Sequence, residues 1–280
     1  MATCINHNGN IIPADEQIFK TSNRTFLYGD GIFESIKVAY GKPVNIEAHY
    51  NRLTKGATTL KIELPYNMTI SCFSQQITEL LKINDHLPAA RVRFTLYRAD
   101  GGLYQPTTNK GMYVIESSPL QNNNFILNSK GLTIDTYEHI KKMPSLISEL
   151  KSCNALNYVM AKMFATQKNL DDCLILNDQK NIVEATSSNI FVVKKNNIST
   201  PPLEEGCVDG TMRKLIIKTI KKTNLLFNEH PINSDDLIDG DEVFLSNAIS
   251  GIKWVLNYKQ KHFSNKTSVL LTERLNKLSL

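Results

Sequence analysis

Alternating and helical patterns of apolar residues divide the first part of the chain into strands and helices. Residues 32–38 alternate in polarity, which predicts a strand whose even-numbered side chains share one face. Apolar residues at helical spacing predict two helices, one from Glu47 and one from Ile70. A second alternating strand carries Arg91 and Arg93 on the same side. Two arginines on one strand face either pair with acids or face an anionic ligand.

A polar stretch that contains proline and asparagine divides the chain into two domains. We expect a small domain at residues 1–118, a linker at 119–125 and a larger domain at 126–280. Beyond the linker, short apolar strands alternate with turns, and a helix is predicted to begin near Gly210.

A lysine of the larger domain lies at the start of a predicted helix. Lys151 follows a loop that contains proline, and apolar residues recur behind it at helical spacing. These are Leu156, Val159, Met160, Met163 and Phe164. A lysine at the rim of an apolar surface can be desolvated, which frees the amine lone pair for attack on a carbonyl. Taken alone, the stretch favours an ordinary solvated lysine.

Three further positions suit an anionic, aromatic ligand. Glu184 ends an apolar strand, where a carboxylate keeps a buried pyridinium nitrogen protonated. Arg52 shares a helical face with His49, and its rigid fork matches a phosphate. The helix start after Gly210 offers backbone N–H groups to an anion. Singly, each has an ordinary interpretation: an edge-strand charge, a salt bridge with a structural histidine, and a capped helix.

Composition narrows the class of protein. The chain has 280 residues, 41% of them hydrophobic and 21% charged, as in soluble globular proteins. No apolar run approaches the roughly 18–20 residues of a membrane span, and no secretory signal is present, so we expect a cytoplasmic protein. Five scattered cysteines favour free thiols and no metal site. The net charge of +5 is dispersed, which argues against nucleic-acid binding.

Six stretches together resemble the class IV pyridoxal-phosphate aminotransferases. This family includes branched-chain aminotransferases, D-amino-acid aminotransferases and aminodeoxychorismate lyases. The matching stretches are Tyr28–Glu34, His49–Leu53, Lys151–Asn154, Glu184–Phe191, Thr200–Leu203 and Gly210–Arg213. They cover nearly the whole chain in the family's order, which makes the resemblance specific where each motif alone is not.

The resemblance implies an α+β, two-domain, D-amino-acid aminotransferase-like fold (PLP fold type IV). It implies a small N-terminal α/β domain, a larger C-terminal β-rich domain with the Schiff-base lysine, and pyridoxal 5'-phosphate in the cleft between them. It also implies a homodimer, in which N-terminal loops of one subunit complete the other's site. The implied catalytic residue is Lys151. The implied cofactor-binding residues are Arg52, Glu184, Ser188, Asn189, Thr211, Met212, Asn247 and Ala248. The implied substrate-binding residues are Phe33, Ser35, Arg91 and Arg93.

The family's branches differ at a few of these positions. D-amino-acid aminotransferases carry a tyrosine at the position of Phe33, and an arginine and a histidine where Leu103 and Gln105 stand. Those groups trap the substrate carboxylate, so their absence argues against that specificity. Branched-chain enzymes carry a tyrosine at the position of Leu156. Tyr158, two residues later, is expected to point elsewhere on the helix.

The choice between a transaminase and a lyase rests on other residues. Ser35 falls where the lyases have a hydroxyl residue, and the stretch 246–249 is similar to theirs. Glu34 and Arg93 look more like the transaminase branch. We therefore expect an aminotransferase that moves an amino group between an amino acid, of branched-chain type, and a 2-oxo acid. The alternative is a 4-amino-4-deoxychorismate lyase that releases pyruvate and 4-aminobenzoate.

Overall fold

The computed structural model describes residues 3–278 and divides into two compact units. The first unit runs to Asn124 and also takes in Leu150–Asn154, and the second holds Phe125–Glu149 and the chain from Ala155 onward. The chain therefore leaves the first unit within the stretch expected to be a linker. The short segment with Lys151 groups with the first unit, although the sequence led us to expect it in the larger domain.

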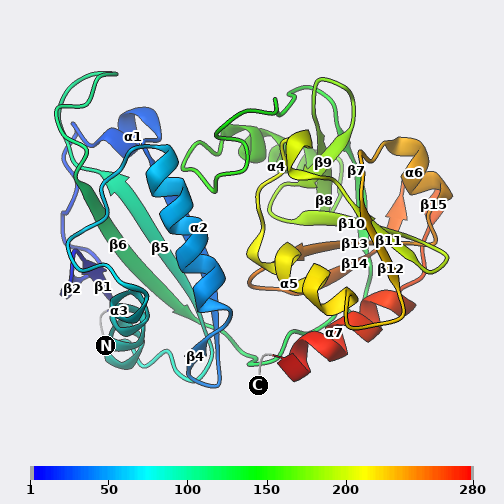
Figure 1. Cartoon of the computed structure of the whole chain (residues 1–280), viewed down its shortest axis with the longest axis horizontal. Helices are drawn as coiled ribbons and strands as arrows, with labels where there is room; N and C mark the ends of the chain where they lie inside the picture. Colours follow the sequence, from blue (N-terminus) through cyan, green and yellow to red (C-terminus); the bar gives the residue numbers. More distant parts are fainter. Residues whose placement is uncertain (1–2, 279–280) are drawn as a thin grey trace. The chain divides into compact units, whose positions relative to one another are not determined.

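The first unit is built on a six-stranded antiparallel sheet in the order β2-β1-β6-β5-β3-β4 (Figure 1). Its strands are β1 (Cys4–His7), β2 (Asn10–Pro13), β3 (Gly31–Ala39), β4 (Lys42–Pro43), β5 (Ala90–Arg98) and β6 (Gly111–Pro119). Its helices are α1 (Arg24–Tyr28), α2 (Ile46–Thr59) and α3 (Ile70–Ile83). The two alternating strands and the two amphipathic helices predicted from the sequence are confirmed.

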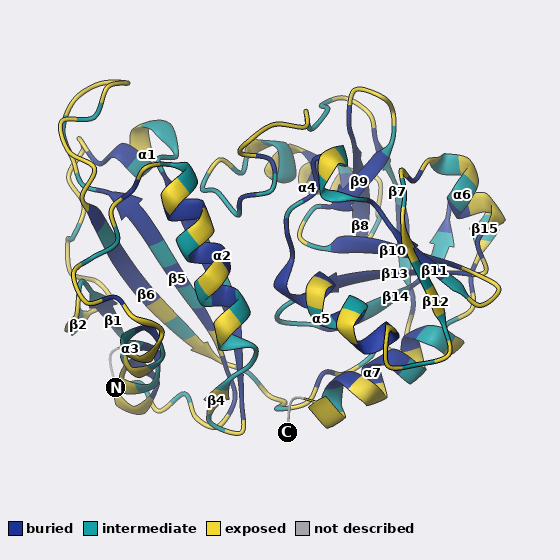
Figure 2. Cartoon of the chain, viewed as in Figure 1, coloured by how far each residue is buried: buried dark blue, intermediate teal, exposed yellow. Residues whose placement is uncertain are grey.

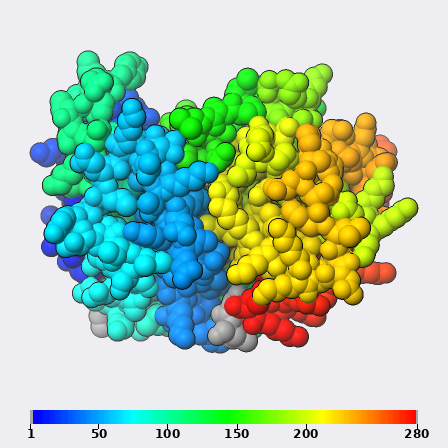
Figure 3. All heavy atoms as spheres, in the orientation of Figure 1, coloured from blue at the N-terminus to red at the C-terminus, as the bar shows by residue number. Residues whose placement is uncertain are grey.

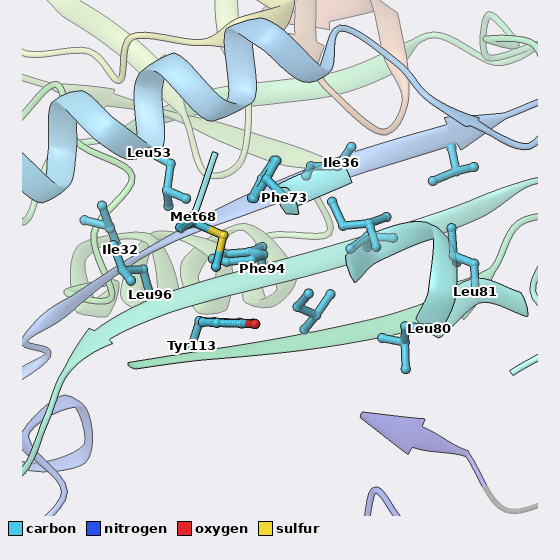
Figure 4. Close-up of a cluster of buried hydrophobic side chains, with 14 of the residues drawn as sticks. Ile32, Ile36, Leu53, Met68, Phe73, Leu80, Leu81, Phe94, Leu96 and Tyr113 are labelled. Atoms are coloured by element: carbon cyan, nitrogen blue, oxygen red, sulfur yellow. The ribbon is translucent and has the colours of Figure 1, made fainter. Parts of the chain in front are cut away.

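The two faces of this sheet have different roles. Ile36 of β3 and Phe94 of β5 lie in the core beneath α2 and α3, where Phe73 of α3 packs on Phe94 (Figure 4). Alternation along the strands places Ser35 and Arg93, which are direct partners in the antiparallel register, on the opposite face. All four predicted substrate-binding residues therefore share the face that these helices leave uncovered.

The second unit contains a nine-stranded sheet in the order β12-β11-β10-β13-β14-β7-β8-β9, with β15 paired to β14. The strands are β7 (Leu132–Tyr137), β8 (Asp172–Leu176), β9 (Ile182–Ala185), β10 (Asn189–Lys194), β11 (Asn197–Thr200), β12 (Leu226–Glu229), β13 (Glu242–Asn247), β14 (Gly251–Tyr258) and β15 (Lys261–His262). The α-helices are α4 (Leu156–Gln167), α5 (Thr211–Ile220), α6 (Ser234–Asp239) and α7 (Lys266–Leu278), with a 3₁₀ turn η1 at Leu203–Glu205. Strand β9 ends the sheet yet also lies against β10, so the sheet curls around its core. Helix α7, red in Figure 3, packs on β14 and α5 and exposes its outer side.

Four of the five residues in the apolar stripe predicted behind Lys151 are exposed on helix α4, whereas the fifth, Phe164, packs against a buried cluster. Leu156, Val159, Met160 and Met163 are 77%, 49%, 43% and 52% exposed (Figure 2). The helix instead buries Ala161 and Ala165 against β7 and β8, because alanines allow a helix to approach a sheet closely. Periodicity predicted which residues share a face but not which face is covered. Among the residues described, no helix is both long enough and apolar enough to cross a membrane.

Candidate active site

In the first unit, Lys151 is fixed to the start of β3 by backbone pairing. The Phe33 N–H donates to the Lys151 carbonyl at 2.8 Å, and the Cys153 N–H donates to the Gly31 carbonyl at 2.9 Å. An isolated bridge pairs Ile32 with Ser152. These bonds hold the lysine backbone as rigidly as a strand and explain why the segment groups with this unit.

A glycine of the N-terminal signature makes room for this segment. Gly29 has φ +66°, and a Cβ there would lie 2.4 Å from Oδ1 of Asn154. Both the left-handed backbone and the close approach require glycine. The signature around Gly29 and the motif that contains Lys151 thus depend on each other structurally, although more than a hundred residues separate them in sequence.

The ring of Phe33 organises the polar side chains on the uncovered face of the sheet. Nζ of Lys151 lies 4.5 Å from the ring centroid, and Cζ of Arg93 lies 3.8 Å from it. Cation–π attraction holds both cations in place. Burial lowers the pKa of Arg93 from its ordinary value, but a guanidinium remains charged at neutral pH. Lysine and arginine therefore contact one aromatic ring.

The other two predicted substrate residues lie further along the same face. Ser35 is half-buried opposite Arg93, whereas Arg91 is exposed. Nε of Arg93 donates to Oγ1 of Thr95 at 3.2 Å, and its ion pair with Glu116 is loose, at 4.0 Å. The structure thus groups Phe33, Ser35 and Arg93, and leaves Arg91 at the solvent-exposed side of the group.

Arg52 belongs to a buried cluster on the helix-covered side of the same sheet. Nε of Arg52 donates to Oε1 of Glu34 at 2.8 Å, and NH2 donates to Oε2 at 2.5 Å. Nδ1 of His49 lies 2.6 Å from the same Oε2. Burial raises the pKa of Glu34, but the charge and hydrogen bonds of Arg52 and His49 outweigh it and lower the pKa to about 2. Glu34 is therefore ionised and fixes the guanidinium by two bonds.

In the second unit, Glu184 is a buried carboxylate with three donors. Oε1 accepts from Nζ of Lys142 at 2.5 Å and from the Tyr158 hydroxyl at 2.7 Å. Oε2 accepts from the Val208 backbone N–H at 2.9 Å. Burial and the charge of Glu184 raise the pKa of Tyr158 above its ordinary value, so the hydroxyl stays protonated and donates. A carboxylate has about four acceptor positions, so Oε2 keeps the capacity for one more donor.

A β-bulge aims Glu184 toward these donors. The pairing of β8 and β9 slips between Ile175 and Leu176, so that Ile175 faces Glu184 and Leu176 faces Ile182. Val183 packs in the cluster beneath α4, and the adjacent Glu184 reaches Tyr158 of the same helix. Strict alternation would send consecutive residues to opposite faces, whereas a bulge permits both to point to one side.

The start of helix α5 is tied to strand β10 by an asparagine. Nδ2 of Asn189 donates to the Val208 carbonyl at 2.9 Å. A Cβ on Gly210 would lie 1.9 Å from Oδ1 of Asn189, so this position excludes any side chain. Gly210 is the N-cap residue and offers no side-chain acceptor to the first turn at Thr211 and Met212. Backbone N–H groups at such a start suit an anion.

A turn at the end of β13 is linked to the start of α5 by strand β10, which pairs with β13. Nδ2 of Asn247 donates to Oγ of Ser188 at 3.1 Å, and its Oδ1 accepts from the backbone of Ile249 and Ser250. Ala248 lies in this turn. In the part of the chain that the structure describes, the hydroxyl of Ser246, opposite Asn189 in the sheet, is buried with no hydrogen-bond partner. The predicted residues of the second unit therefore form one continuous set around β9, β10 and α5.

Sequence reasoning missed two side chains of this set. Lys142 lies in the loop before Lys151 and was one of many lysines without a pattern. Tyr158 was expected to point in another direction than Leu156, and it does: Leu156 is exposed, whereas the Tyr158 hydroxyl reaches Glu184, a contact that the sequence did not predict. The one signal in the sequence was the position of Tyr158 among the apolar residues of the predicted helix. The contact depends on the bulge in β9, which the sequence does not reveal.

Three comparisons with known proteins show which proteins the chain is similar to. The model of the family "amino-transferase class IV" matches residues 31–258. The chain is 28% identical over 272 residues to a protein of Methanocaldococcus jannaschii provisionally named a branched-chain-amino-acid aminotransferase, covering 96% of this chain and 92% of that one. It is 27% identical to the aminodeoxychorismate lyase of Vibrio harveyi, over 82% of this chain and 83% of that one. The crystal structure of the Thermoproteus uzoniensis branched-chain aminotransferase with norvaline superposes with a TM-score of 0.90 at 19% identity, covering 100% of this chain and 95% of that one.

Proposed function

The chain belongs to the class IV aminotransferases, and from this premise we propose that it is a pyridoxal-phosphate-dependent enzyme that moves an amino group between a branched-chain-type amino acid and a 2-oxo acid. One observation carries the proposal. The buried Glu184 retains an acceptor position on Oε2 and is hydrogen-bonded to the loop that leads into α5. Pyridoxal phosphate requires a carboxylate that accepts a hydrogen bond from its ring N–H, and a group such as a helix N-terminus that binds its phosphate.

The residues of the second unit fit the cofactor. Glu184 would accept the ring N–H and keep that nitrogen protonated. The backbone N–H groups of Thr211 and Met212 would bind the phosphate, where the absence of a side chain at Gly210 gives access. Ser188, Asn189, Asn247 and Ala248 would shape this anion site. Among the described residues the buried Ser246 hydroxyl, next to Asn247, has no hydrogen-bond partner, as expected if a polar group of the ligand lies there.

Arg52 completes the set of proposed cofactor ligands. A guanidinium binds phosphate through paired N–H groups, and Glu34 sets the plane of the Arg52 fork by holding its Nε edge. When bound, the cofactor draws electrons from the α-carbon of the substrate. We assign to Arg52 only the binding of the phosphate.

Lys151 is the proposed catalytic residue. Its amine would hold the cofactor until the amine of the substrate displaces it, and the freed Lys151 amine would then move the proton at the α-carbon of the substrate. The Phe33 ring beneath Nζ excludes water from one side and restricts the positions of the amine. Arg93, stacked on the same ring, would bind a carboxylate of the substrate, with Ser35 beside it and Arg91 as a second, exposed cation.

The lyase alternative has two supporting observations. Ser35 presents a hydroxyl on the same face as Lys151 and Arg93, and the relatives include aminodeoxychorismate lyases. The two functions are distinguished by products. Purified protein with cofactor is incubated with leucine, valine or isoleucine and 2-oxoglutarate, and separately with aminodeoxychorismate. Glutamate and a branched 2-oxo acid support the transaminase. Pyruvate and 4-aminobenzoate alone would replace it by the lyase.

We also propose that the enzyme is a cytoplasmic homodimer. Its second unit exposes a set of apolar side chains on α4 and the loop before it, and exposed apolar side chains that gather in one patch mark contacts between proteins. The set comprises Met143, Leu146, Ile147, Leu156, Val159, Met160 and Met163. Leu156→Glu would place a charge in this set and should convert a dimer to a monomer in sedimentation experiments, whereas the control Leu226→Glu, on strand β12 of the same unit, should not. A monomeric wild-type protein would refute the dimer.

A further inference from the structure

Lys142 is a cation at the candidate site, and the proposed function assigns no role to it. Its side chain is 11% exposed, and Nζ lies 2.5 Å from Oε1 of Glu184. Its backbone is also fixed, because its N–H donates to the Leu176 carbonyl at 2.8 Å. A buried ammonium with both ends anchored is costly to form and to move.

The charge of Glu184 is already balanced by this lysine. Among the described residues, Tyr158 and Cys207 are titratable neighbours of Glu184 besides Lys142. Burial and the charge of Glu184 raise the pKa of Cys207 to about 12, so the thiol is neutral, as is the Tyr158 hydroxyl. The nearby Asp209 and Arg213 have partners of opposite charge in Lys214 and Glu229. The negative charge of the Glu184 carboxylate is therefore balanced by the positive charge of the Lys142 ammonium, and the local net charge is zero.

We propose that Lys142 moderates Glu184: by neutralising the carboxylate through Oε1, it weakens the hold of Oε2 on the protonated ring nitrogen of the cofactor. This inference rests on the proposed function. Two cations that share one buried carboxylate repel each other, and each lowers the gain from the other. Because the ring withdraws electrons more strongly when its nitrogen is protonated, Lys142 sets how strongly Glu184 activates the cofactor.

A purely structural salt bridge makes a different prediction. If Lys142 only supported the fold, its loss would weaken every ligand of this site equally. If it moderates Glu184, its loss strengthens the one interaction that involves the ring nitrogen. The affinity of pyridoxal phosphate divided by that of its 1-deaza analogue, in which C–H replaces the ring nitrogen, isolates that interaction.

The experiment measures this affinity ratio by equilibrium dialysis with the full chain freed of cofactor. Lys142→Met removes the ammonium, Lys142→Gln removes the charge but keeps a donor, and Lys142→Arg keeps the charge. We expect Lys142→Met and Lys142→Gln to raise the ratio roughly tenfold or more, because an ion pair at this distance shifts a protonation equilibrium by at least one order of magnitude. Lys142→Arg should keep the ratio near that of the wild type. Glu184→Gln should abolish the preference for pyridoxal phosphate over the 1-deaza analogue.

A ratio unchanged or lowered in Lys142→Gln would overturn the inference. So would equal losses of both affinities, which mark a structural role. If Lys142→Met does not fold, Lys142→Gln, which keeps a donor to Oε1, tests the same point. Failure of the wild type to bind pyridoxal phosphate at all would refute the proposed function itself. Binding with an unchanged ratio in the variants would refute only the role of Lys142.

Discussion

The cluster of Glu34, Arg52 and His49 predicts a measurable dependence of stability on pH. The pKa of Glu34 in the folded protein is about 2, against an ordinary value of 4.5. The difference of about 2.5 units corresponds to about 3 kcal/mol of folding free energy. Because the folded pKa is the lower one, this contribution is complete above pH 4.5 and is lost as the pH falls toward 2.

Glu34→Gln removes that contribution directly. At pH 7 we expect a loss of about 3 kcal/mol in the free energy of unfolding, since the substitution leaves Arg52 buried without its carboxylate. Urea denaturation followed by circular dichroism measures the loss, and hydrogen exchange of peptides from β3 and α2 localises it. The difference from the wild type should shrink when both are measured near pH 3.

A matched control is available on the same sheet. Glu116 is exposed, and its ion pair with Arg93 spans 4.0 Å, so Glu116→Gln should cost less than about 1 kcal/mol. Equal effects of the two substitutions, or a loss in Glu34→Gln that does not change between pH 7 and pH 3, would refute the assignment of Glu34 as an ionised partner of Arg52.

Two further predictions concern the site itself. Gly210→Ala places a Cβ 1.9 Å from Oδ1 of Asn189, so we expect the affinity for pyridoxal phosphate in equilibrium dialysis to fall roughly tenfold or more; unchanged affinity would contradict the proposed phosphate site. Arg93→Met should raise KM for the 2-oxo acid roughly tenfold to a hundredfold, because a hydrogen bond to a charged group is worth roughly 1.5–3 kcal/mol; equal effects of Arg93→Met and Arg91→Met in steady-state kinetics would contradict the choice of Arg93.

The features that local geometry determines could be predicted from the sequence. Alternation predicted that Phe33 and Ser35 share one face of β3 and that Arg91 and Arg93 share one face of β5, because successive strand side chains point to opposite faces. The glycine before α5 marked the helix start to within a residue or two. These predictions needed no knowledge of the tertiary structure, and the structure confirms them.

The features that depend on long-range packing could not be predicted. The bulge in β9 brings Glu184 into contact with Tyr158, and the path of the loop before Lys151 brings Lys142 into contact with Glu184. The stripe on α4 shows the same limit, because periodicity does not say what covers a face. The expected domain limits, at 118 and 126, and the roles of the individual site residues stay predictions.

The central claim is that Lys151 is the residue that carries the cofactor. The protein is incubated with pyridoxal phosphate, treated with borohydride and digested, and mass spectrometry locates the phosphopyridoxyl label. We expect the label on Lys151, and we expect Lys151→Ala to lose both the label and the transfer of amino groups while its circular dichroism stays unchanged. A label on another lysine, such as Lys142, or transfer that persists in Lys151→Ala, would contradict the account.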